Sequence, residues 1–164
     1  MIAKIKVKNK NEANNGASVV EFAIILPLLF IFVFAIIEFG VLFYDKAVLN
    51  DSIRNNSRNA ILYTPNELTD SEFRTLIYNN IKNDLENRLI SFKNSLFDFN
   101  KDSNEHITWK NKEGEEISWD DINRGDGSVL VLNIPYSFKF LIFSTLLGGP
   151  DGIPLTAKAV MRVE

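Results

Sequence analysis

The sequence predicts an α+β protein. It has a single N-terminal transmembrane helix extended into a helical spine, which carries a small exoplasmic domain of one amphipathic helix plus an antiparallel sheet. Three observations predict this fold. Residues 22–37 form an apolar run without a charge, residues 73–89 carry apolar side chains at helical spacing, and short stretches with strand-like alternation follow from residue 107. The 164 residues suffice for one modest domain beside a membrane segment.

Formal charge divides the chain into three predicted parts. Residues 1–16 carry a net charge of +3, residues 17–44 carry −2 and residues 45–164 carry −4. Because Lys and Arg are enriched on the cytoplasmic side of membrane spans, we expect the N-terminus in the cytoplasm and the C-terminal domain outside. We therefore predict a basic cytoplasmic leader over 1–16, a transmembrane helix over 17–44 and an extracytoplasmic domain over 45–164. An acidic outer domain argues against a nucleic-acid partner.

The segment 17–44 is long enough to cross a bilayer. As a helix it would reach roughly 42 Å, against about 30 Å for the hydrocarbon core. The excess would emerge on the outer side, with Phe43 and Tyr44 near the interface. Pro27 lies within the span, where membrane helices tolerate proline.

Two other kinds of N-terminal segment share part of this pattern. A secretory signal peptide also has a basic start and an apolar run, but here the run is long, Glu21 interrupts its start, and no small-x-small cleavage site follows at 39–45. An uncleaved signal anchor needs only the charge asymmetry and the span. That alternative stays open on these features.

Two acids mark the ends of the apolar run. A carboxylate near the bilayer interior costs about 2.5–3.5 kcal/mol, so Glu21 is a functional candidate by default. It either pairs with a cation or extends to the inner headgroups. For Glu38 we expect solvation at the outer interface, with a helix contact through Gly40 as the alternative.

Several segments together resemble the TadE-like family of type IVb minor pilins and pseudopilins. The motif Gly-Ala-Ser-Val-Val-Glu-Phe at 16–22 leads into the apolar run, and further similar segments follow at 26–29, 37–40, 57–60 and 155–164. The related major Flp pilins usually carry tyrosine where this chain has Phe22.

The resemblance implies a role in assembling Tad (Flp, type IVb) pili, which serve surface adherence. It implies that a prepilin peptidase cuts after Gly16 and leaves Ala17 as the mature N-terminus. It also implies that Glu21, with Phe22, guides subunit docking. The implied partners are this peptidase, other Tad pilins and pseudopilins, and the inner-membrane assembly platform, with the chain held in the cytoplasmic (inner) membrane. An uncleaved signal-anchored protein, whose outer domain binds a ligand or stabilises a membrane complex, remains the alternative.

In the outer part, the helix is expected to continue through 45–60 as a stalk that ends before a turn at 64–66. Thr69 and Glu72 form a predicted capping box for the amphipathic helix. A hairpin is expected over 107–119, with its turn at 112–114, and a central strand over 128–140 with 153–163 as its antiparallel neighbour. The apolar segment 141–147 is read as a short helix, a membrane-proximal loop or a contact surface.

The chain lacks the residues of an enzyme, and we predict no cofactor and no metal. It has one histidine, His106, no cysteine and no glycine-rich phosphate loop. Two acidic groups contain oxygen ligands without the spacing of an EF-hand, so solvated loops are the favoured interpretation and calcium the alternative. These groups are Asp98, Asp102 and Glu105, and Asp120, Asp121, Asn123 and Asp126.

Overall fold

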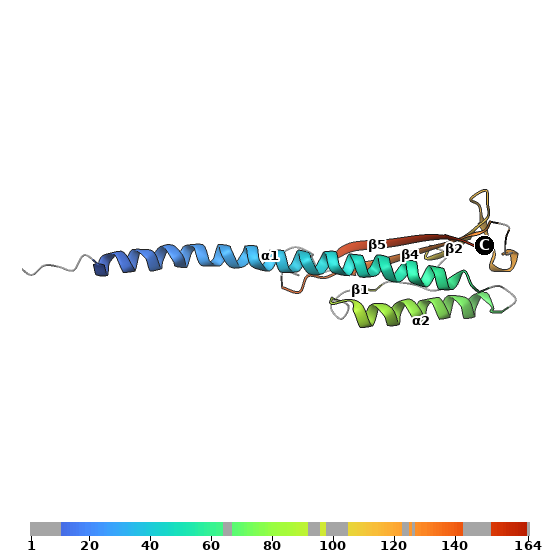
Figure 1. Ribbon diagram of the computed structural model, residues 1–164, viewed down its shortest axis with the longest axis horizontal. Coiled ribbons are helices and arrows are strands. Elements are labelled where there is room, and N and C mark those ends of the chain that lie inside the picture. The colour runs from blue at the N-terminus through green and yellow to red at the C-terminus, as the bar shows by residue number, and fades with distance from the viewer. Residues whose placement is uncertain are drawn as a thin grey trace, which may run out of the picture. The chain divides into compact units, whose positions relative to one another are not determined.

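The computed structural model describes residues 11–63, 67–91, 96–97, 105–122, 125, 127–142 and 152–163 (Figure 1). The element order is α1 (Asn11–Ala60), α2 (Asp70–Arg88), β1 (Leu96–Phe97), β2 (Ile107–Lys110), β3 (Glu116–Ile117), a 3₁₀ turn (Trp119–Asp121), β4 (Val129–Phe138) and β5 (Ile153–Arg162). The chain divides into two compact units, Met1–Ile37 and Glu38–Glu164. Helix α1 supplies the described part of the first unit and the first element of the second.

In the first unit, α1 exposes nearly all of its large apolar side chains. Pro27 lies inside the helix, and the rings of Phe30 and Phe34 stack with centroids 5.9 Å apart. Among the described residues, α1 is the one helix long and apolar enough to cross a membrane. The predicted leader boundary at Gly16 falls within this helix, which begins at Asn11.

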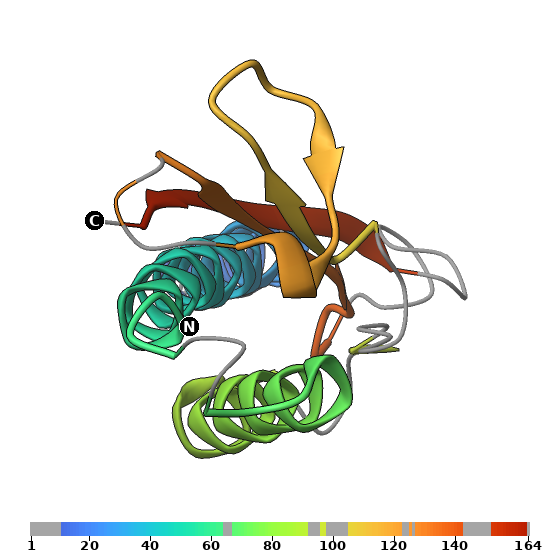
Figure 2. The same ribbon diagram turned by 90° about the vertical axis from the view of Figure 1, so that its right-hand side faces the viewer.

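In the second unit, two helices lie on the same side of an antiparallel sheet (Figure 2). The central strand β4 pairs with β5 along ten residue pairs and with β1 and β2 on its other edge, while β2 pairs with β3. Alternate residues of β4 are buried, from Leu130 to Phe138, and the residues between them are partly exposed. The expected central strand and its antiparallel neighbour are confirmed, which makes the fold α+β with a helical N-terminal spine. The hairpin is confirmed for β2 and β3, but its second strand ends at Ile117, and Trp119 begins a 3₁₀ turn instead.

The core of this unit joins three apolar surfaces. Helix α1 contributes a face with Leu49 and Ile53, and the sheet contributes the buried side of β4. Helix α2 contributes four buried members of its expected apolar stripe, namely Phe73, Ile77, Ile81 and Leu85. Phe73 also stacks on Trp119, with ring centroids 4.4 Å apart, and contacts Trp109 at 5.7 Å. Both tryptophans of the chain therefore lie in the core of the second unit.

Helix α2 begins with the capping box that the sequence predicts. The backbone N–H of Thr69 donates to the Glu72 carboxylate at 2.9 Å, and the Glu72 N–H donates to the Thr69 hydroxyl at 3.4 Å. These hydrogen bonds satisfy helix-end groups that would otherwise lack partners. The turn expected at 64–66 and most of the apolar segment 141–147 lie outside the described residues.

Candidate functional site

The predicted processing and docking residues lie together near the start of α1. Gly16, Ala17, Glu21 and Phe22 are all helical and exposed. A methyl group added at Gly16 would meet nothing within 4 Å, so this glycine is not required by local packing. A glycine inside a helix lowers helix stability by about 1 kcal/mol relative to alanine, which favours local opening at this position.

Glu21 lies about one helical turn after Ala17, the residue whose amine a cleavage after Gly16 would free. Ala17 and Glu21 are four residues apart in α1, so they lie on the same helix face. No described residue forms an ion pair with Glu21. The carboxylate is thus open to a cation from its own chain terminus or from a neighbouring chain.

The expectation for Glu38 is wrong: this acid is buried. Its side chain is 1% exposed, and it accepts hydrogen bonds from the backbone N–H groups of Leu141, at 3.0 Å, and Ile142. A carboxylate can accept several such bonds, and these partners replace the water that interfacial solvation would provide. Gly40 contacts no other segment of its own chain, since a methyl group there would meet nothing within 4 Å, and a contact between Gly40 and a helix of another chain stays a prediction.

Asp45, seven residues after Glu38 in α1, is a second buried acid that binds backbone N–H groups of a distant segment. It is fully buried and accepts hydrogen bonds from the backbone N–H groups of Ile90, at 3.0 Å, and Ser91, at 3.1 Å. It also accepts from the Ser91 hydroxyl, which in turn lies 2.8 Å from the Tyr136 hydroxyl. Residues at i and i+7 share a helix face, so one face of α1 binds both the segment after α2 and the segment after β4.

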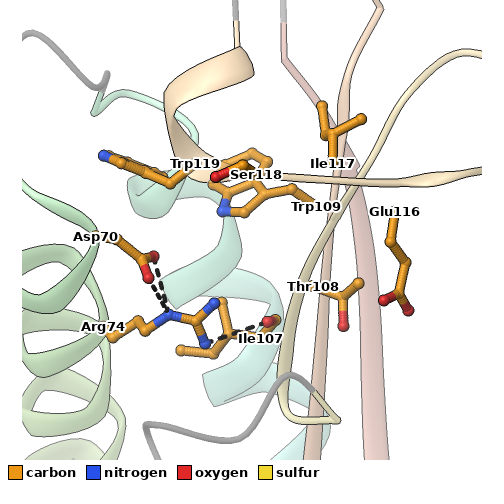
Figure 3. Close-up of a pocket in the computed structure, with 9 residues that line it drawn as sticks. All are labelled: Asp70, Arg74, Ile107, Thr108, Trp109, Glu116, Ile117, Ser118 and Trp119. Carbon is orange, nitrogen blue, oxygen red and sulfur yellow. Dashed lines mark hydrogen bonds and ion pairs between the residues drawn. The ribbon is translucent and has the colours of Figure 1, made fainter.

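A polar recess of about 360 Å³ lies beside the start of α2 (Figure 3). At its wall, Arg74 forms an ion pair of 2.9 Å with Asp70, and its guanidinium donates to the Ile107 carbonyl at 3.4 Å. The indole N–H of Trp119 donates to the Leu68 carbonyl, whereas that of Trp109 is buried without a hydrogen-bond partner among the described residues. Arg74 is not among the residues predicted above, although the i and i+4 spacing of Asp70 and Arg74 is a signal of an ion pair in the sequence.

The metal alternatives gain no support within the described part of the chain. No group of three His, Cys, Asp or Glu side chains there could hold an ion. Four members of the predicted acidic groups lie outside it, namely Asp98, Asp102, Asn123 and Asp126. His106 lies in the turn before β2, where its carbonyl accepts a hydrogen bond of 2.8 Å from the Asn133 N–H.

Comparison with known proteins finds a similarity in the N-terminal part of the chain. A family model described as TadE-like protein matches residues 16–55. This segment contains the predicted processing and docking residues and also the buried acids Glu38 and Asp45. No curated protein and no solved structure matches the chain. The resemblance to TadE-like proteins is therefore confirmed over residues 16–55 of α1.

Proposed function

We propose that the chain is a TadE-like minor pilin or pseudopilin, a membrane-anchored structural component in the assembly of Tad pili for surface adherence. The match over residues 16–55 carries this proposal, because it ties the apolar helix to a family related to the Tad pilus. The family is a structural one, which supports a protein that is not an enzyme.

In this proposal the helix is the anchor and the second unit is the outer domain. The basic residues before Gly16 stay in the cytoplasm, and α1 crosses the inner membrane with the C-terminal domain outside. A prepilin peptidase cuts between Gly16 and Ala17. The new amine then offsets the cost of the Glu21 carboxylate in the membrane, either in the same chain or in a neighbouring pilin. When the amine belongs to a neighbouring pilin, the pairing also sets the stagger between the packed helices.

N-terminal sequencing of the chain purified from its host membrane tests the processing step. With the prepilin peptidase present we expect the sequence to begin at Ala17, and with the peptidase deleted we expect the uncut leader. An intact leader in the presence of the peptidase contradicts the proposal. So does a mature start near Asp45, which is the expected product of a secretory signal peptidase.

The second candidate is an uncleaved signal-anchored protein whose outer domain binds a ligand. The recess beside Arg74 favours it, because it is a concave site with the buried Trp109 indole N–H at its lining. The same sequencing experiment separates the two candidates, since this one predicts an intact leader in every host.

A further inference from the structure

Large apolar side chains gather at the end of the second unit that follows the apolar helix. Five of them are exposed within this unit, and we call this group the apolar collar: Phe39, Phe43, Tyr44, Leu141 and Ile142. The three from α1 lie within two helical turns of Glu38, and the other two belong to the segment that Glu38 holds.

Glu38 fixes this segment beside the helix. Its carboxylate oxygens accept the N–H groups of Leu141 and Ile142, and the ring of Phe39 meets that of Phe140 edge to face at 6.1 Å. Phe140 is buried, yet the next two side chains are 42% and 51% exposed. The segment is therefore anchored through its backbone while its apolar side chains are presented outward.

Because Glu38 is buried, the stretch of α1 without an exposed charge extends beyond Ile37. From Phe22 to Tyr44, Glu38 is the only charged side chain, and it is hidden. These 23 residues of α1 would measure about 34 Å as a helix, compared with roughly 30 Å for a hydrocarbon core. The apolar surface thus continues past Ile37 and ends at Tyr44, whose ring and hydroxyl suit a membrane interface.

We infer that the apolar collar is a lipid-binding surface, which lies in the outer interface of the membrane and holds the domain against it. The inference rests on the proposed membrane anchoring of α1. Lipid is the occupant that the observations favour, because the collar continues the apolar surface of the anchor without an intervening exposed charge.

The absence of cysteine permits a direct test on the full chain. A single cysteine replaces Ile142, and a bimane label on it reports its surroundings in phosphatidylcholine liposomes that contain only this protein. We expect strong quenching by lipids with a doxyl group near the headgroup, and loss of quenching by aqueous iodide. Leu141→Cys is the second collar variant, in case the first does not fold as judged by tryptophan fluorescence.

Two control positions make the outcome decisive. Leu62→Cys carries its label just beyond the far end of α1, at a side chain that is 64% exposed, and should show strong iodide quenching and weak doxyl quenching. Phe30→Cys reports the anchor itself. If the Phe30 label is quenched by doxyl lipids but the Ile142 label behaves like the Leu62 label, the collar inference fails while the anchor stands.

Two other results also overturn the inference. Protection of the Ile142 label from both quenchers would mean that a neighbouring copy covers the collar instead of lipid. Iodide quenching of the Phe30 label would mean that α1 is not embedded in the bilayer, which removes the basis of both the collar and the proposed function.

Discussion

The carboxylate of Glu38 in α1 and the backbone N–H of Leu141 are joined by a hydrogen bond of 3.0 Å that closes 103 residues of chain. A second bond runs from the Ile142 N–H to the other carboxylate oxygen.

We predict that Glu38→Gln lowers the free energy of unfolding of the second unit by about 1.5–3 kcal/mol, because glutamine keeps the shape of the side chain but offers one acceptor oxygen instead of two. Denaturant titration of the full chain in micelles measures this, with tryptophan fluorescence as the signal because Trp109 and Trp119 both lie in this unit's core.

Glu21→Gln is the matched control for that change. The same substitution at an exposed carboxylate in the same helix should leave the unfolding free energy of the second unit within about 0.5 kcal/mol of the wild type. Equal stability of the two variants would contradict the role assigned to Glu38.

Asp45→Asn should loosen the junction after α2. Asparagine loses one carboxylate acceptor, so one of the donors from Ile90 and Ser91 is left without a partner in a buried place. We expect faster amide hydrogen exchange at these two residues and a loss of about 1.5–3 kcal/mol in unfolding free energy. Asp51→Asn is the control, because the Asp51–Arg88 pair of 2.7 Å is largely exposed and such pairs contribute about 0–1 kcal/mol.

The burial of Glu38 and Asp45 could not be predicted from the sequence, whereas several local elements of the fold could. The capping box, the apolar stripe of α2 and the alternation of β4 are local patterns, and the structure confirms them. Glu38 follows an apolar run, and its neighbours in sequence predict solvent contact, yet its partners lie 103 and 104 residues further on. Every residue other than proline has a backbone N–H, so the sequence does not indicate which N–H groups bind a carboxylate. No local pattern could therefore predict the hydrogen bonds of Glu38 to Leu141 and Ile142.

The recess beside Arg74 could not be predicted from the sequence either, because its lining comes from segments far apart in the chain. Its lining combines the first turn of α2 with β2, β3 and the 3₁₀ turn. These elements meet through contacts between residues far apart in the sequence, among them the packing of Phe73 against Trp109 and Trp119. The spacing of Asp70 and Arg74 indicates an ion pair, but not a cavity beside it.

The capping box makes a pH-dependent contribution to stability. Hydrogen bonds from the side chain and backbone of Thr69 lower the pKa of the Glu72 carboxyl below its ordinary value. A lowered folded-state pKa stabilises the fold above the unfolded value, about 4.3 for glutamate, and this stabilisation is lost as pH falls through the folded value. Unfolding free energies of the wild type and Glu72→Gln should therefore differ at pH 6 by an amount that shrinks below about pH 4. A constant difference down to the acid limit would show that the carboxylate charge is not involved.

Glu21 should control assembly without affecting the fold. If its carboxylate pairs with a neighbouring chain's amine, Glu21→Gln should reduce the amount of this chain that co-purifies with the other pilins by at least about tenfold, equivalent to about 1.4 kcal/mol. Glu21→Asp keeps the charge and should recover part of the association. The measurement is quantitative immunoblotting of the pilus fraction, normalised to the membrane content of each variant. Full co-purification of the glutamine variant would exclude a docking role for this charge.

Gly16→Ala should block processing while leaving membrane insertion intact. Insertion depends on the apolar run, whereas cleavage depends on the junction at Gly16 and Ala17. The added methyl group meets nothing within 4 Å in the folded chain, so a packing clash does not account for an effect on processing. Gly40→Ala is a close control, because it makes the same change in the same helix, also into open space, with the same gain of about 1 kcal/mol in helix propensity. In cells with the prepilin peptidase, immunoblots should show the uncut form for Gly16→Ala and the mature form for Gly40→Ala, both in the membrane fraction. Equal processing of the two variants would show that the peptidase does not read Gly16, and failure of both would attribute the effect to the helix instead of the junction.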